Sequence, residues 1–318
     1  MTLFLADRRI CRWRMLWEFT GRMQAWKHRR NREDHDLVTV KIGDGMGNQM
    51  YNYACGYAAA KRSGEKLRLD ISECDNSTLR DYELDHFRVV YDEKESFPNR
   101  TFWQKLYKRL RRDIRYHVIR ERDMYAVDER VFVPARRGRY LHGYWQCLGY
   151  FEEYLDDLRE MFTPAYEQTD AVRELMQQFS QTPTCALHVR GGDLGGPNRA
   201  YFQQAIARMQ KEKPDVTFIV FTNDLPKAKE CLDDGEARMR YIAEFGEALS
   251  DIDEFFLMSA CQNQIISNST YSTWAAYLNT LPGRIVIVPK FHGVEQMALP
   301  DWIVLDGGAC QKGEIDAV

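Results

Sequence analysis

Several features that would assign this chain of 318 residues to a class of protein are missing from it. No apolar run approaches the roughly 20 residues that span a bilayer, so no transmembrane helix is predicted. The eight cysteines form no Cys-x-x-Cys pair, so we predict no zinc site and expect reduced thiols. A net charge of -3 gives no overall attraction to nucleic acid, and we expect no nucleic-acid partner. No uninterrupted apolar signal core is visible, so a cytoplasmic location is expected.

The positive charge is concentrated in two segments. Residues 1–36 hold nine basic and five acidic residues, a charge of +4, which leaves -7 on the remainder. Residues 101–121 form a second basic stretch that we predict to be a surface helix. The alternatives are a solvated basic surface and peripheral contact with the inner face of a membrane, whose lipids or lipid-linked acceptors are anionic.

Short β-branched runs alternate with helical segments along the rest of the chain, which is typical of α/β proteins with parallel sheets. Two units are predicted, an N-terminal one at 37–165 and a C-terminal one at 166–318, after the basic extension 1–36. The expected strands and helices are, in the first unit, strands 37–42 and 67–70 with helix 50–63 and, in the second, strands 185–190, 218–221, 264–266 and 284–289 with helices 251–261 and 269–278.

A glycine-containing loop follows the first predicted strand. Gly43 and Gly45 begin a GxGxxG dinucleotide pattern, but Asn48 occupies its third glycine position. No Lys-Ser/Thr pair follows, which excludes a P-loop. A helix start after such a loop favours an anionic ligand, although a purely structural turn is also compatible. Asp70, at the end of the next strand, keeps an NAD(P)-dependent oxidoreductase open as an alternative.

A second group of polar residues closes the strand at 185–190. His188 and Arg190 lie two residues apart and therefore point to the same side of the strand. Arg190 is expected at the carboxyl end, where open α/β sheets bind ligands, and its guanidinium suits a diphosphate. Asp193 can orient Arg190 or cap the next helix. The simpler alternative is a buried Arg–Asp pair.

A third group lies between the strand at 264–266 and the helix at 269–278. Its hydroxyls and free backbone N–H groups, at Asn268, Ser269 and Thr270, can bind an anion. Simple N-capping by Ser269 or Thr270 is the alternative. Two such sites in one unit, one with an arginine, favour a diphosphate ligand.

Taken together, these segments resemble the α-1,2-fucosyltransferases of glycosyltransferase family 11. Five patterns of that family match segments of this chain. GGxGNQxFxYA matches residues 44–54, GYWQ matches 143–146 and HxRRGDY matches 188–193. FSND matches 221–224, and D-x-x-LMS-x-C-x-x-x-I-x-x-NSTFSWW matches 253–278. The departures are Asp44 for the first glycine, Gly191 for the second arginine, Leu194 for tyrosine and Thr273 for the first tryptophan.

The resemblance implies a fold and a reaction. The fold is GT-B-like, with two Rossmann-like domains whose parallel sheets face a central cleft. The reaction is an inverting transfer of L-fucose from GDP-fucose to O2 of a galactose-type acceptor, with no bound metal and no cofactor. The Asp251-Ile252-Asp253 spacing does not contradict this, because it lies within a predicted helix.

The resemblance also implies roles for the site residues. Arg190, Asp193 and His188 form the catalytic group, with Arg190 on the β-phosphate and Asp193 or Asp44 as candidates for the base. Asp253 is the candidate for guanine recognition. The remaining residues expected at the donor are Asn223, Asp224, Asn268, Ser269 and Thr270, and those of the donor/acceptor loop are Gly45, Gly47, Asn48 and Gln49. A non-catalytic protein that binds a nucleotide sugar or a glycan is a further alternative.

Overall fold

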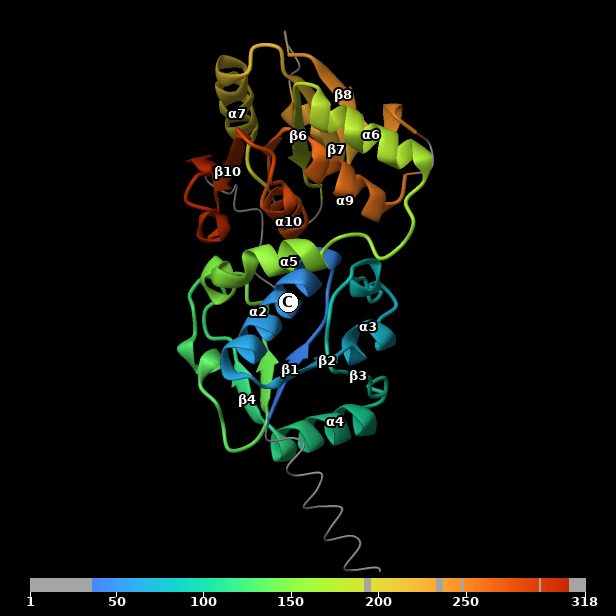
Figure 1. Cartoon of the computed structure of the whole chain (residues 1–318), viewed down its shortest axis with the longest axis vertical. Coiled ribbons are helices and arrows are strands. Elements are labelled where there is room, and N and C mark those ends of the chain that lie inside the picture. The colour runs from blue at the N-terminus through green and yellow to red at the C-terminus, as the bar shows by residue number, and fades with distance from the viewer. Residues whose placement is uncertain (1–35, 192–195, 233–236, 247–248, 292, 309–318) are drawn as a thin grey trace, which may run out of the picture.

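The computed structural model describes residues 36–191, 196–232, 237–246, 249–291 and 293–308. They form two α/β halves, one above the other along the long axis of the molecule, each built on a parallel sheet (Figure 1). The predicted fold class is confirmed. Asp193, Leu194 and nearly all of the basic segment 1–36 lie outside the described residues.

The first half is built on a sheet of five strands, all parallel to their neighbours. In sheet order they are β3 (Glu93–Glu95), β2 (Lys66–Asp70), β1 (Leu37–Lys41), β5 (Arg139–His142) and β4 (His117–Arg120). The helices are α2 (Met46–Ser63), α3 (Ser72–Asn76), α4 (Phe102–Arg115) and α5 (Leu155–Met161), with 3-10 turns η1 (Leu84–His86), η2 (Glu129–Phe132), η3 (Leu148–Tyr150) and η4 (Glu152–Tyr154).

The second half has a parallel sheet of six strands. In sheet order they are β11 (Ile303–Asp306), β10 (Val286–Lys290), β9 (Asn263–Ile265), β6 (Thr184–Val189), β7 (Thr217–Thr222) and β8 (Met239–Tyr241). The helices are α6 (Asp170–Gln181), α7 (Arg199–Glu212), α8 (Leu225–Cys231), α9 (Asp251–Ala260) and α10 (Thr270–Leu278), with 3-10 turns η5 (Ile242–Glu244) and η6 (Val294–Met297).

The second basic segment differs from its prediction. The helix expected over 101–121 begins after the cap residue Thr101 but ends at Arg115, and residues 117–120 form strand β4. The β-branched pair Val118-Ile119 explains the change, because these side chains fit the edge of a sheet better than a helix. No helix in the described part of the chain is long and apolar enough to cross a bilayer.

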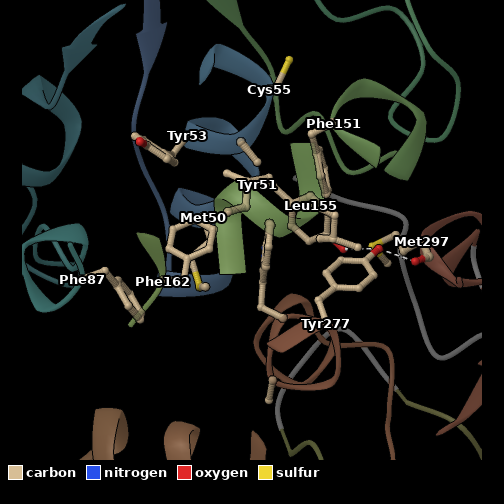
Figure 2. Close-up of a cluster of buried hydrophobic side chains, with 14 of the residues drawn as sticks. Met50, Tyr51, Tyr53, Cys55, Phe87, Phe151, Leu155, Phe162, Tyr277 and Met297 are labelled. Carbon is tan, nitrogen blue, oxygen red and sulfur yellow. Dashed lines mark hydrogen bonds between the residues drawn. The ribbon is translucent and has the colours of Figure 1, made fainter. Parts of the chain in front are cut away.

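The two halves share one hydrophobic core. Tyr51 of α2, Phe151 of the first half and Trp274 of α10 lie against one another, with ring centroids 5.2 Å (Tyr51–Trp274) and 5.4 Å (Phe151–Trp274) apart. Figure 2 shows the buried side chains around Tyr51 and Phe151, where the hydroxyl of Tyr277 from α10 lies 3.4 Å from that of Tyr51. Aromatic side chains bury the largest apolar areas, so this packing fixes the position of α10 on α2.

At its upper end, α2 touches the start of α10 through a glycine. A Cβ placed on Gly47 would lie 2.5 Å from the carbonyl carbon of Thr270 and 2.5 Å from the nitrogen of Tyr271. By contrast, a Cβ on Gly45 would meet nothing within 4 Å. Gly47 is therefore required by the close approach of two backbones, whereas Gly45 is not.

We expect Gly47→Ala to lower the free energy of unfolding by about 1–3 kcal/mol, because the added methyl group would force α2 and α10 apart. Denaturant unfolding of the full chain measures this. Gly45→Ala is the matched control and should change stability by less than about 1 kcal/mol. Equal stability of the two variants would show that the helices do not approach as described.

Candidate functional site

The carboxyl edges of the two sheets meet through one asparagine. Asn48, in the first turn of α2 after β1, accepts a hydrogen bond at Oδ1 from Thr270 Oγ1 (3.0 Å). The same oxygen accepts a second bond from Gln146 Nε2 (2.9 Å). The predicted loop residue Asn48 and the predicted anion-site residue Thr270 are thus in direct contact. Ligands of open α/β sheets bind at this edge, so the junction is the candidate site.

The loops on the first half are held in uncommon backbone conformations. Asp44 has φ 62° and Trp145 has φ 57°. Aspartate tolerates this left-handed region better than most residues, which explains how Asp44 can stand where the family pattern has glycine. Asn52 joins the two loops by donating from Nδ2 to the carbonyls of Gly143 (2.9 Å) and Tyr144 (3.3 Å).

Gln49 is fully buried and supports the site from behind. Its Nε2 donates to the carbonyls of Asp44 (2.9 Å) and Asp81 (2.8 Å), and its Oε1 accepts from the N–H of Glu83 (2.9 Å). Its side-chain amide is therefore engaged by the backbone on both sides. Contact of Gln49 with a substrate, expected from the sequence, stays a prediction.

Arg190 follows β6, which pairs with β9, the strand that leads to Ser269 and α10. A Cβ on Gly196 would lie 3.8 Å from the Arg190 carbonyl oxygen and 3.5 Å from Asn268 Oδ1. The backbone at residue 190 and the segment before α10 therefore adjoin. Within the described ranges, Arg190 has no carboxylate partner.

A second arginine, which the sequence analysis missed, comes from the first half. Burial, and then the positive charge of Arg80, lower the pKa of the Arg190 guanidinium, so the two cations lie near each other. The loop at 77–83 is fastened on both sides of Arg80, since Ser77 Oγ accepts its N–H (3.0 Å) and Gln49 holds the carbonyl of Asp81. Arg80 is exposed and forms no ion pair with the residues described. Two neighbouring cations with no carboxylate partner among the described residues are suited to binding an anion.

The turn after Arg190 explains the departure at Gly191. Its N–H donates to Asn223 Oδ1 (2.9 Å), and a Cβ at this position would lie 2.2 Å from the Cβ of Asp224. Asp224 itself caps α8 by accepting from the N–H of Lys227 (3.0 Å). An arginine at 191 would overlap Asp224, so the second cation of the family pattern has no room here. Asn223 and Asp224 hold this turn.

His188 is buried beneath the site. Its Nδ1 lies 2.9 Å from Ser267 Oγ, and its ring centroid lies 6.0 Å from that of Tyr271. Burial, and then the charge of Arg190, lower the pKa of His188 to about 3. The imidazole is therefore neutral at physiological pH, and its position suits support of the neighbouring loop.

The start of α10 carries backbone N–H groups that have no acceptor within the helix. Ser269 is its N-cap and is 5% exposed, but its side chain makes no capping hydrogen bond. Thr270 follows as the first helical residue and contacts Asn48. The N–H groups of the first helical turn have no partner within a helix, and the positive end of the helix dipole favours an anion there.

Two acidic residues on α9 are candidates for contact with the guanine base of a nucleotide. Asp253 is already engaged, because its Oδ1 accepts from Tyr166 Oη (3.0 Å) and its Oδ2 caps the helix through Ser250. Glu254 has no side-chain partner in the part of the chain described, and burial followed by the charge of Asp251 raises its pKa to about 7. The D-x-x-LMS spacing, counted back from Leu257, also falls on Glu254. Sequence reasoning chose Asp253 and passed over this signal.

Asp70, on which the oxidoreductase alternative depended, faces inward. It is 1% exposed, lies 3.0 Å from Lys108 Nζ, and accepts from Ser72 and from the Tyr140 hydroxyl. Burial works to raise its pKa, but Lys108 and these hydrogen bonds outweigh burial and the pKa is lowered. Its oxygens are thus occupied, which leaves no acceptor for a ribose hydroxyl.

The described residues contain no group of three or more side chains arranged to hold a metal ion. Asp251 and Asp253 lie in the first turn of α9, as expected from the sequence.

Comparison with known proteins defines the class of this chain, which is a glycosyltransferase. The chain belongs to glycosyl transferase family 11, whose model matches residues 2–306. The resemblance drawn from the sequence motifs is therefore confirmed.

Three relatives cover most of this chain. The O-antigen biosynthesis glycosyltransferase WbnK of Escherichia coli is 28% identical, over 83% of this chain and 99% of its own. An alpha-1,2-colitosyltransferase of Escherichia coli is 27% identical, over 80% and 91%. Galactoside alpha-(1,2)-fucosyltransferase 2 of Gorilla gorilla gorilla is 24% identical, over 95% and 90%.

The raised pKa of Glu254 predicts a change in stability with pH. The charged form is disfavoured in the folded protein, so the contribution of this group is fully present below its ordinary pKa of 4.5 and is lost as pH rises through about 7. Glu254→Gln should remove that loss and raise the Tm at pH 8 by a few degrees, with little effect at pH 4.5. Glu174→Gln, an exposed acid on α6, is the control. A Tm difference independent of pH would contradict the assignment.

Proposed function

We propose that the enzyme transfers L-fucose from GDP-fucose to O2 of a galactose-type acceptor, with inversion and without a bound metal ion. The observation that carries the proposal is that Arg190 and the start of α10 adjoin at the junction of the two sheets. Membership of family 11 and the named activity of the galactoside alpha-(1,2)-fucosyltransferase support the donor and the acceptor.

In the proposed reaction the acceptor hydroxyl attacks the anomeric carbon of fucose. The new carbon–oxygen bond forms as the bond from that carbon to the β-phosphate breaks, and the bonding electron pair leaves with GDP. The hydroxyl proton passes to a base, for which Asp44 is the candidate among the residues described. Negative charge therefore grows on the β-phosphate, and groups that stabilise this charge in the transition state accelerate the reaction.

The phosphates are assigned to positive groups from both halves. Arg190 and the amides of α10 contribute from the second half, with Ser269 and Thr270 adding hydroxyl groups. Arg80 contributes from the first half and supplies the charge that Gly191 removes from the family pattern. Charge-assisted hydrogen bonds are each worth about 1.5–3 kcal/mol, so this set can take the place of a divalent cation.

Guanine is assigned to the acids of α9. A carboxylate can accept hydrogen bonds from N1 and N2 of guanine, and Glu254 has its oxygens available whereas Asp253 is engaged by Tyr166 and Ser250.

Adenine offers no such pair of donors, so Glu254→Gln should also reduce the preference for GDP over ADP, measured as the ratio of the two dissociation constants. Unchanged preference would return the role to Asp253.

A second donor has support from one relative. An alpha-1,2-colitosyltransferase is nearly as similar as the O-antigen glycosyltransferase WbnK, and colitose is the 3-deoxy analogue of fucose. We place GDP-fucose first and GDP-colitose second. Surface polysaccharides, lipid-linked oligosaccharides and free galactosides are the candidate acceptors.

A transfer assay tests the function directly. The full chain with GDP-fucose and a panel of β-galactosides should release GDP and form an α-1,2-fucosylated product, equally well with EDTA present. Product linkage is read by NMR, and GDP-colitose serves as the second donor. Heat protection by GDP but not by NAD would separate the enzyme from an oxidoreductase. Binding of GDP-fucose without transfer to any acceptor would favour the non-catalytic alternative.

The two arginines should contribute unequally. We expect Arg190→Ala to lower kcat/KM by at least about 100-fold and Arg80→Ala by about tenfold, because Arg190 is more buried and its bonds are less screened. Calorimetric titration of GDP measures the share of this loss that is binding. Arg208→Ala, on the surface of α7, is the control and should leave both values unchanged. Normal GDP affinity in Arg80→Ala would remove Arg80 from the site without affecting the role of Arg190.

A further inference from the structure

Helix α4 is turned the opposite way from an ordinary surface helix. Its basic side faces the protein, where Lys108 pairs with Asp70 (3.0 Å) and Arg111 lies 3.7 Å from Glu95. Arg112 also packs inward, with its NH1 nitrogen 3.2 Å from His142 Nδ1. A surface helix normally buries its apolar stripe and exposes its charges, so this orientation needs an explanation.

The sheet beneath α4 supplies the reason for the inward charges. One face of β2 and β5 carries Arg68, Asp70, Tyr140 and His142, which alternate with the leucines that point to α2. Tyr140 donates to Asp70, and Arg68 pairs with Glu93. This face is a polar layer, so the helix that covers it must offer polar groups.

The apolar side of α4 is therefore left outside. Trp103, Tyr107 and Ile114 are 75%, 65% and 68% exposed, and no residue of the helix is buried. Phe102 and Leu110 extend the same surface, at 70% and 52%. Positions 103, 107, 110 and 114 follow the helical spacing and form one stripe. A contiguous apolar surface of this kind marks an interaction site.

The segment that carries the stripe is positively charged. Helix α4 holds six basic residues and one acid, Asp113. Lys105 and Arg100, which lies just before the helix, are exposed and form no ion pair with other described residues. Arg109 and Arg112 already share Asp113. A partner for this surface must therefore offer an apolar layer to the stripe and negative charges to the basic side chains.

We propose that α4 lies flat in the interfacial layer of an anionic lipid membrane, with Trp103, Tyr107, Leu110 and Ile114 among the acyl chains and the basic residues of the segment attracted to the headgroups. Charge complementarity selects this occupant. A second copy would bring the same positively charged helix, and the chain's own residues 1–36 carry +4, so both are repelled. An aromatic and aliphatic stripe on a helix rich in Lys and Arg is the composition of interfacial helices.

The position of α4 allows such docking without obstruction of the site. In Figure 1 it lies at the end of the first half farthest from the second half, whereas the site is at their junction. The bound enzyme would therefore project its second half away from the bilayer.

Co-sedimentation of the full chain with lipid vesicles tests the proposal. Vesicles of phosphatidylcholine with about 30% phosphatidylglycerol should bind the protein at least about tenfold more tightly than phosphatidylcholine alone, and added salt should weaken binding. Trp103→Ser with Ile114→Ser should lower binding to anionic vesicles at least about tenfold, as should Arg100→Glu with Lys105→Glu. Transfer to a soluble galactoside should stay unchanged in both variants.

Matched controls come from the second half. Leu225→Ser with Val304→Ser removes two exposed apolar residues, and Lys211→Glu with Lys229→Glu reverses two exposed charges; neither pair should change vesicle binding. Wild-type binding by the α4 variants would overturn the proposal. The proposal would also be overturned if the wild type were a dimer and the α4 variants were monomers that still bound vesicles. The apolar stripe would then be covered by a second copy of the chain. Vesicle binding and sugar transfer are measured separately. The vesicle assay therefore tests the membrane proposal even if the proposed transfer activity is not found.

Discussion

The contact between the first turns of α2 and α10 is the constraint on which the site depends. Gly47 lets the two backbones approach, and Asn48 then receives the hydroxyl of Thr270 and the amide of Gln146 on one oxygen. Three loops that are far apart in sequence are thereby fixed by one residue. Two helix starts directed at one place concentrate positive potential there, which is the property that a diphosphate requires.

The positive charge at this junction comes from both halves. Arg190 follows a strand of the second sheet, Arg80 belongs to a loop of the first half, and this loop is held by the buried amide of Gln49. Two like charges held close together destabilise the free protein, and in the proposed function the diphosphate removes this repulsion. The overlap of any side chain at 191 with Asp224 shows why the second cation could not come from the neighbouring position in the chain.

Much of the fold was predictable, because strands such as Phe218–Phe221 are short, apolar and followed by polar turns, which is a local signal. The end of α4 was not, since a run of basic residues continues across the change from helix to strand at Tyr116. In the candidate site, motifs singled out Arg190 and Thr270, and the pairing of β6 with β9 explains why the segments that carry them adjoin. Arg80 gave no signal, because its position near Arg190 arises from the folding of a loop against Gln49. The inward orientation of α4 was also hidden, since periodicity defines a stripe but not the side on which the protein lies.

The hydrophobic core shared by Tyr51, Phe151 and Trp274 has a consequence for engineering. In enzymes whose halves touch only across solvent, one half can be exchanged for that of a homologue to alter which sugar is accepted. Here such a chimera would have to carry a matched pair of α2 and α10, because an unmatched pair would leave aromatic side chains exposed or in collision. Exchange of short exposed loops would leave this core intact, whereas exchange of whole halves would not.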